Sequence, residues 1–316
     1  MKPHTLKRRE FLSKAGYGIG AACLGGGALL GGSGLARGLF RRDPLAPEAL
    51  ANAAWCSEPL PRKFTATETV TLGNTGIKTS RLAMGTGTVG VGHHSHQTAL
   101  GVAGLSALLL NGYEQGLRFF DAADSYGSHP HVAAALKQVP RDKVTVLTKT
   151  WSRDAASARA DLDRFRKELG TDYLDVCLMH CLTESDWTER YRGVMDVLSE
   201  AKQRGIIRSH GCSCHSIEAL RAAAKSSWVE VDLVRINPIG SHMDADPETV
   251  VGVLREMRAA GKGIVGMKIM GQGDLRGRQD EAVKYALSLG LLDAFTIGAE
   301  NKAEQDDLIR RIGAAA

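Results

Sequence analysis

The sequence Arg118-Phe119-Phe120-Asp121-Ala122-Ala123-Asp124-Ser125-Tyr126-Gly127 decides the fold and the chemistry that we expect of this chain. Two aromatic residues carry a short strand that ends on Asp121, and Tyr126 follows five residues later in a small, polar turn. A free tyrosine titrates near ~10, so a phenol that acts as an acid at neutral pH needs a shift of up to about 3 units, roughly 4 kcal/mol. A cation held by a carboxylate supplies such a shift. The stretch therefore predicts a proton-donating site at a strand end.

Two more polar residues end predicted strands. Residues 144–149 form a strand-like run that ends on Lys149, and residues 173–180 form another that ends on His180. Singly, each residue has an ordinary explanation, because a strand-end aspartate is often a helix cap, a lysine is usually solvated and a histidine is usually a satisfied core residue. A shared catalytic site explains why four such residues follow three successive strands: Asp121, Tyr126, Lys149 and His180.

Strands and helices alternate from residue 70 onward. Residues 70–78 combine turn chemistry with β-prone residues and predict a hairpin. We expect strands at 80–86, 118–121, 144–150, 173–180, 207–213, 230–236, 263–269 and 294–298, and helices at 98–115, 130–138, 155–168, 187–204, 216–225, 247–261, 278–289 and 302–311. This alternation predicts an α/β fold, a (β/α)8 TIM barrel with an N-terminal β-hairpin, over residues 66–316. The alternative is an open doubly wound sheet, but residues 85–90 lack its phosphate-binding fingerprint.

The basic charge of the chain is concentrated at its start. The formal net charge is +5, and residues 1–36 hold five basic side chains against a single acid, so the remainder gives no indication of nucleic-acid binding. Residues 7–14, Lys-Arg-Arg-Glu-Phe-Leu-Ser-Lys, resemble a twin-arginine export signal. The apolar residues 15–32 are too rich in glycine for a stable transmembrane anchor. We expect a signal segment at 1–36, recognised by the twin-arginine export machinery, a proline-interrupted linker at 37–65, and a periplasmic protein; a disordered basic tail is the alternative.

Residues from about 66 to 312 resemble the aldo-keto reductase family. The resemblance rests on residues 120–127, 148–150 and 175–180 and on the opening hairpin. It implies an enzyme that reduces a small aldehyde or ketone by hydride transfer from a nicotinamide cofactor. Tyr126 would be the general acid, Lys149, held by Asp121, would lower its pKa, and His180 would orient the carbonyl. The chemistry agrees, because an ammonium favours phenolate and a neutral imidazole can donate a hydrogen bond to the substrate oxygen.

The resemblance also implies a cofactor site at the strand ends. The expected cofactor-binding residues are Gly85, Thr86, Ser213, Cys214, Arg235, Met267, Lys268, Gly271, Gly273, Gly298 and Ala299. Cys214 stands where the family usually has an amide, and Met267 stands where it usually has an aromatic ring that stacks on nicotinamide. The cofactor is NADP or NAD, and we expect weakened selectivity for NADP, because Glu300 and Glu304 near the last predicted helix favour a ribose hydroxyl over a phosphate dianion.

The substrate pocket is expected to be lined by His94, His129 and Trp151, and no metal is expected. The six cysteines predict ordinary buried thiols, although a pair could approach among the cysteines of two neighbouring predicted strands, Cys177, Cys181, Cys212 and Cys214. Two alternatives stay open. The fold could serve as a non-turnover nicotinamide-binding sensor or partner subunit. His94-Ser95-His96 after the first strand is also reminiscent of metal-dependent amidohydrolases, although the metal-binding aspartate of that family is missing after the eighth strand.

Overall fold

The structure, a computed structural model, describes residue 60 and residues 62–315. The predicted signal segment at 1–36 and most of the predicted linker at 37–65 lie outside these residues. Among the described residues, no helix combines the length and the apolar character that a membrane crossing requires.

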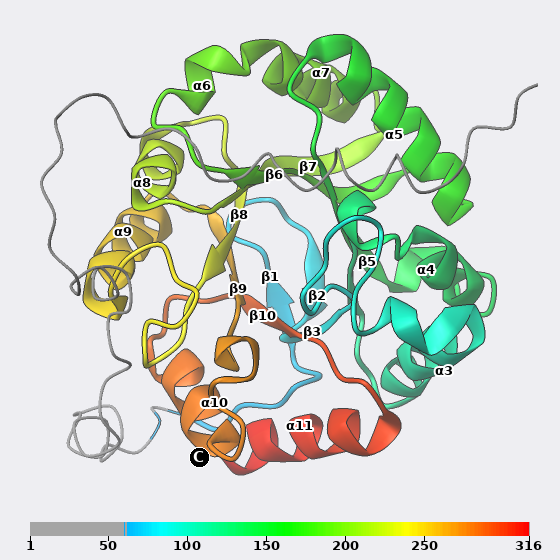
Figure 1. Cartoon of the computed structure of the whole chain (residues 1–316), viewed down its shortest axis with the longest axis vertical. Coiled ribbons are helices and arrows are strands. Elements are labelled where there is room, and N and C mark those ends of the chain that lie inside the picture. Colours follow the sequence, from blue (N-terminus) through cyan, green and yellow to red (C-terminus); the bar gives the residue numbers. More distant parts are fainter. Residues whose placement is uncertain (1–59, 61, 316) are drawn as a thin grey trace, which may run out of the picture. The chain divides into compact units, whose positions relative to one another are not determined.

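Eight parallel strands close into a barrel, which confirms the predicted (β/α)8 TIM barrel (Figure 1). In chain order the strands are β3 (Leu82–Gly85), β4 (Phe119–Asp121), β5 (Thr145–Thr150), β6 (Leu174–Leu182), β7 (Ile207–Cys214), β8 (Val231–Arg235), β9 (Gly263–Met267) and β10 (Ala294–Ile297). β10 pairs with β3 and completes the ring. Because the ring is closed, the alternative of an open doubly wound sheet is wrong.

Helices surround the barrel and cover its outer face (Figure 1). They are α3 (Gly101–Glu114), α4 (His129–Leu136), α5 (Ala155–Leu169), α6 (Trp187–Arg190), α7 (Arg192–Gln203), α8 (Ile217–Lys225), α9 (Pro247–Ala259), α10 (Gln279–Ser288) and α11 (Lys302–Ala314). The helix expected at 187–204 is divided at Tyr191 into α6 and α7. Side-chain caps define four helix starts, those of α5, α8, α9 and α11, through Asp154, Ser216, Asp246 and Asn301.

The pleat of the strands separates an inner core from an outer one. Alternate side chains point into the barrel and pack as one cluster, which includes Ala83, Phe119, Leu147, Val176, Leu178, Val231, Leu233, Val265 and Ala294. Their neighbours along each strand, such as Phe120 and Cys177, pack outward with the helices. This alternation also directs Asp121, Lys149 and His180 inward, because each lies an even number of residues from an inner-core residue of its own strand.

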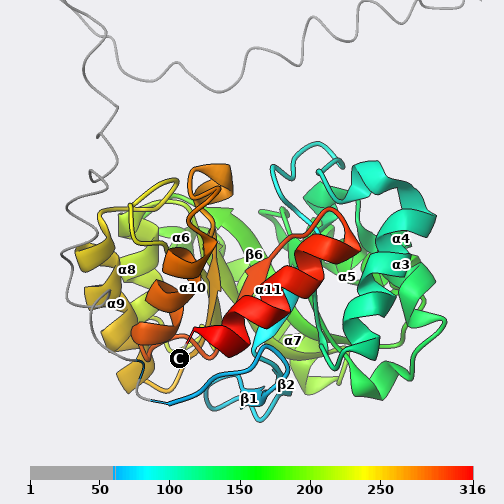
Figure 2. The same ribbon diagram turned by 90° about the horizontal axis from the view of Figure 1, so that it is seen from below.

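An antiparallel hairpin closes the amino-terminal end of the barrel. Strands β1 (Thr69–Thr71) and β2 (Lys78–Ser80) pair below the barrel in the view of Figure 2. Leu72 and Ile77, from the turn between them, are fully buried in the inner core. Gly73 has a φ of +47°, and a Cβ there would lie 2.3 Å from the backbone nitrogen of Gly263. The hairpin therefore plugs this end, and the carboxyl end of the strands is left for function.

We predict that Leu72→Ala lowers the free energy of unfolding by about 2–5 kcal/mol, because it leaves a cavity at the base of the barrel. Urea unfolding measures the loss. Val70→Ala is the matched control, since Val70 belongs to the same hairpin but is only half-buried. Equal losses in the two variants would show that the hairpin does not plug the barrel.

Candidate active site at the carboxyl end of the barrel

A buried ion pair lies at the centre of the site. Lys149 Nζ lies 2.5 Å from Asp121 Oδ1 and donates a second hydrogen bond to the backbone oxygen of Ala122 at 2.8 Å. Thr296 Oγ1 donates to the other carboxylate oxygen of Asp121 at 2.9 Å. Lys149 is 0% exposed. Burial would by itself lower the pKa of Lys149, but the charges of Asp121 and Tyr126 raise it above its ordinary value, so the ammonium form persists.

Tyr126 lies beside this pair. It belongs to the short 3-10 helix Asp124–Tyr126 that follows β4, and Lys149 Nζ lies 4.8 Å from the centre of its ring. Burial raises the pKa of the phenol, and although the charge of Lys149 opposes this, the net shift is upward. The expected net lowering of the Tyr126 pKa is therefore wrong for the protein by itself, because the loss of hydration outweighs the ammonium. The phenol keeps its proton at neutral pH and can donate it.

Two glycines make room for the Tyr126 ring. A Cβ at Gly87 would lie 2.2 Å from Cε2 of Tyr126, and a Cβ at Gly90 would lie 2.2 Å from Cδ1. Real Cβ atoms do not come so close, so both positions accept only glycine without moving the ring. The sequence of residues 85–90 indicated only that a phosphate-binding fingerprint is missing, and it did not predict that Gly87 and Gly90 lie beside the phenol.

His180 lies against Tyr126. Their ring centroids are 5.6 Å apart and the ring planes meet at 82°, and Ser125 Oγ lies 3.4 Å from His180 Nδ1. Burial holds the pKa of His180 well below its ordinary value, and the positive charge of Lys149 adds to this. The imidazole is therefore neutral, as the sequence predicts. β6 continues two residues beyond His180 with a shift in its pairing to β7, and Cys181 has a φ of +58°. This irregularity sets the position of the ring.

Trp151 and Arg153 complete the surroundings of His180. Trp151 is 44% exposed and the centroid of its ring lies 5.2 Å from that of His180, so Trp151 lies at the surface beside His180, although it does not line the cleft next to Tyr126. Arg153 Nη2 donates to the backbone oxygen of His180 at 2.6 Å. The sequence analysis missed Arg153, because a single arginine after a strand carries no distinctive pattern.

The other two expected pocket histidines lie elsewhere. His129 is buried against α5, where Nδ1 lies 2.7 Å from Glu168 Oε2 and Nε2 lies 2.7 Å from Thr148 Oγ1. Both ring nitrogens are used, so His129 supports the loop and does not face a substrate. His94 is exposed and does not line the cleft beside Tyr126. His96 pairs with Glu300 through Nδ1 at 2.8 Å, and within the described residues neither His94 nor His96 belongs to a group that could hold a metal.

A cleft of about 340 Å³ begins at Tyr126 and extends between the loops after β9 and β10. Five of the expected cofactor residues line it: Gly85, Met267, Lys268, Gly273 and Gly298. Its other lining residues include several that the sequence analysis missed: Thr88, Arg276, Gln279, Thr296 and Asp307. The apolar Met267, the cationic Lys268 and the open space at Gly273 fit a long ligand that carries both a flat ring and phosphates.

The remaining expected cofactor residues do not line this cleft. Cys214 points outward from β7 because it lies next to the inward Ser213, whose Oγ accepts a hydrogen bond from the backbone of Cys181 at 3.1 Å. Arg235 is paired with Asp244. Thr86, Gly271 and Ala299 are buried: Thr86 donates to the backbone oxygen of Asp121 at 2.8 Å, Gly271 lies inside a 3-10 turn, and Ala299 packs in the outer core.

The start of α11 already holds a carboxylate. The backbone N–H of Glu300 donates to Glu304 Oε2 at 2.9 Å, and Asn301 caps the helix by accepting from the N–H of Glu304 at 2.9 Å. Glu300, Glu304 and Asp307 all line the cleft. The backbone N–H of Glu300, which could otherwise receive an anion at this helix start, is therefore already satisfied, and the surroundings are acidic.

We predict that His180 stays neutral at pH values at which an ordinary histidine is already protonated. The physical reason is the burial of its ring beside Lys149. The pH dependence of its imidazole signals in NMR spectra measures this, with His180→Asn for assignment. A midpoint near the ordinary value of about 6.5 would contradict the described environment.

The chain is similar to known proteins of one family. The profile of the aldo/keto reductase family matches residues 81–288. An aldo-keto reductase of Mycolicibacterium smegmatis is 32% identical over 156 residues, which cover 46% of this chain and 50% of that protein. The methylglyoxal reductase DkgB of Salmonella typhi is 28% identical over 132 residues, which cover 40% and 49%. The matches thus span about half the length of these curated relatives.

Solved structures show the same fold. A holo aldo-keto reductase of Bacillus halodurans superposes with a TM-score of 0.64 at 16% identity and covers 78% of this chain and 91% of its own. The Bombyx mori aldo-keto reductase AKR2E4, solved in complex with NADP, gives a TM-score of 0.60 at 18% identity and covers 80% and 92%. At these identities the likeness concerns the fold alone.

Proposed function

The chain belongs to the aldo/keto reductase family, and we propose that it reduces an aldehyde or ketone with a nicotinamide cofactor, using Tyr126 as the general acid. The observation that carries the assignment of Tyr126 is the buried Lys149–Asp121 pair beside it, at one end of the cleft. The names of the relatives support the reaction class, since they include a methylglyoxal reductase.

Reduction of a carbonyl adds a hydride to carbon and a proton to oxygen. The cofactor, when bound, supplies the hydride. Tyr126 supplies the proton, and its raised pKa keeps the proton available at neutral pH. As the O–H bond of Tyr126 breaks, negative charge develops on the phenol, and the fixed ammonium of Lys149 stabilises that charge. Asp121 holds the ammonium in place, so little reorganisation accompanies the transfer.

His180 has a different part in the proposed reaction. Its neutral ring can donate one hydrogen bond to the carbonyl oxygen and so orient it toward Tyr126. An imidazolium would compete with Tyr126 as a proton donor, and burial beside Lys149 prevents this. Trp151, exposed beside His180, is the proposed apolar wall against which the substrate packs.

The cleft suits a nicotinamide dinucleotide. Met267 would lie against the nicotinamide ring, because its thioether is polarizable and the residue lines the cleft next to Tyr126. Lys268 and the backbone around Gly273 would hold the diphosphate. Lys268 has no carboxylate partner among the described residues, and its ammonium donates only to Gln272. Gly298 would lie toward the adenosine.

We predict that Tyr126→Phe lowers the rate of carbonyl reduction by about 10²–10⁴-fold, because the variant has no proton to donate. A panel of carbonyl compounds with either reduced cofactor measures the rate, and quenching of protein fluorescence by the cofactor checks that binding is kept. Tyr173→Phe is the matched control, since Tyr173 precedes β6 at the opposite end of that strand from His180.

A reduction rate within tenfold of wild type for Tyr126→Phe would remove the proposed role of the phenol. A wild-type protein that binds the cofactor but reduces no carbonyl on a broad panel would instead support the alternative of a cofactor-binding sensor or partner subunit.

We further propose that the enzyme accepts NADH at least as well as NADPH. The acidic side chains Glu300, Glu304 and Asp307 line the outer part of the cleft, and Glu304 already occupies the N–H of residue 300. An additional phosphate dianion placed there would meet like charges. Arg276, on the opposite wall, is the one lining arginine within the described part of the chain.

We predict that Glu304→Gln strengthens NADPH binding by about tenfold, or ~1.4 kcal/mol, and leaves NADH binding nearly unchanged. Dissociation constants of both reduced cofactors, measured by fluorescence titration, test this. Glu189→Gln is the control for the charge change, because Glu189 is an exposed acid on α6 that does not line the cleft. A hundredfold preference of the wild type for NADPH would contradict the proposal.

A further inference from the structure

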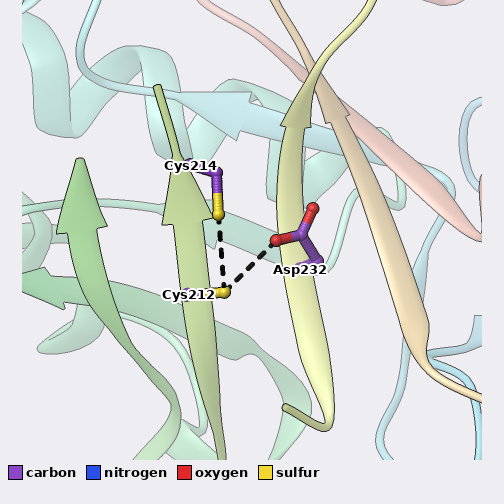
Figure 3. A group of neighbouring side chains, drawn as sticks. All are labelled: Cys212, Cys214 and Asp232. Atoms are coloured by element: carbon purple, nitrogen blue, oxygen red, sulfur yellow. Dashed lines mark hydrogen bonds between the residues drawn. The ribbon is translucent and has the colours of Figure 1, made fainter. Parts of the chain in front are cut away.

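Two thiols and a carboxyl group converge on the outer face of the barrel, away from the cleft. Cys212 and Cys214 lie on β7 and Asp232 lies opposite them on β8 (Figure 3). Because residues two apart on a strand project to the same side, both thiols point outward, and the intervening Ser213 points inward. The two sulfur atoms are 3.9 Å apart, and Cys212 Sγ lies 3.4 Å from Asp232 Oδ1. One ligand atom from each of the three residues lies within 4.8 Å of the others.

All three side chains are completely buried, and the cluster is incompletely satisfied. Each residue is 0% exposed. Asp232 Oδ2 is buried without a hydrogen-bond partner, and so is Oδ2 of Asp244, which follows β8. A buried, unpartnered carboxylate oxygen in a native structure calls for an explanation, and an ion is one of the few that physical chemistry offers.

The surroundings of the cluster leave room for a positive charge. Lys262 is the nearby cation, but its ammonium donates to the backbone oxygens of Ser226 and Val229 and not to the cluster. Two thiolates and a carboxylate beside one ammonium leave a charge of −2, which a divalent ion neutralises.

Two of the three separations between ligand atoms match a tetrahedral zinc ion, and the third, between Cys214 and Asp232, is within 4.8 Å. Zinc–sulfur bonds of about 2.3 Å place two thiolates about 3.8 Å apart, and a zinc–oxygen bond of about 2.0–2.2 Å places sulfur and oxygen about 3.5 Å apart. The cluster shows 3.9 Å and 3.4 Å for these two separations. A disulfide would instead need the sulfur atoms at about 2.05 Å, and the described cysteines are free.

We propose that Cys212, Cys214 and Asp232 form a structural zinc site that ties β7 to β8. These strands share only two Cα pairs in register, Gly211 with Val231 and Cys212 with Asp232, whereas β8 and β9 share five. A metal bridge would strengthen this short ladder. In this proposal a water bridges the ion to Asp244, whose Oδ1 pairs with Arg235 and whose Oδ2 is buried without a hydrogen-bond partner. Since the cluster is closed to solvent, the ion enters as the chain folds.

Metal content of the full chain, purified without chelators, tests the proposal. We expect about one zinc ion per chain in the wild type, and its loss in Cys212→Ser and Asp232→Asn. Cys177→Ser is the matched control, because Cys177 is an equally buried thiol on β6 outside the cluster. Tyr126→Phe should keep its zinc, so the measurement of zinc content tests the metal site independently of the proposed carbonyl reduction.

Two further measurements keep the result clear if a cysteine variant fails to fold. The wild type, refolded with cobalt in place of zinc, should show thiolate-to-metal charge-transfer absorption, and the nearly isosteric Asp232→Asn should lose it. A chelator present during refolding should lower the Tm of the wild type but not that of Asp232→Asn.

Three outcomes would overturn the proposal. The first is a wild type that takes up no zinc even when refolded with it. The second is zinc that stays in both Cys212→Ser and Asp232→Asn. The third is zinc that is lost in His96→Ala, which would place the ion in the loop after β3 and favour the alternative of a metal-dependent hydrolase.

Discussion

The site depends on one buried ion pair, that between Lys149 and Asp121. Burying an unpaired ammonium that is 0% exposed would cost several kilocalories per mole. The pair is stable because Lys149 donates hydrogen bonds to Asp121 and to the backbone oxygen of Ala122, and because Thr296 donates one to Asp121. β4, β5 and β10 must therefore be in register before the pair can form. The geometry of the site is in this sense a consequence of barrel closure, and Tyr126 and His180 take their environment from a charge that the barrel alone can hold.

The alternation of strands and helices was sufficient to predict the barrel, and strand ends were sufficient to bring Asp121, Lys149 and His180 together. The side-chain pleat explains two of the misses. Cys214 is outward because Ser213 is inward, and Thr296 is inward by the same rule. The expected place of His129 in the substrate pocket was wrong for another reason: His129 is the first residue of α4, and its direction depends on Glu168, which is distant in sequence.

The environment of Tyr126 shows why a motif predicts residues better than it predicts their energetics. The motif places a cation beside a phenol, which by itself lowers the pKa. The amount of burial depends on Gly87 and Gly90, whose close approach to the ring removes water, and this desolvation is the larger effect. The proposed reduction needs a phenol that holds its proton until the oxygen of the substrate becomes basic, and a raised pKa beside a cation is consistent with that direction.

The inward and outward faces of β7 and β8 differ in how well their polar groups are paired. Inward residues such as Ser213 and Arg235 form hydrogen bonds or ion pairs within the barrel, whereas the outward Asp232 is buried among helices with an unpartnered oxygen. Catalysis does not require a carboxyl group on that outer face, and a valine there would pack at lower cost. The carboxyl group of Asp232 lies beside two thiols, where β7 and β8 share only two residue pairs in register. A metal ion bound by all three groups accounts for a carboxyl group at this position. The strand that positions the inner face would then be braced from outside.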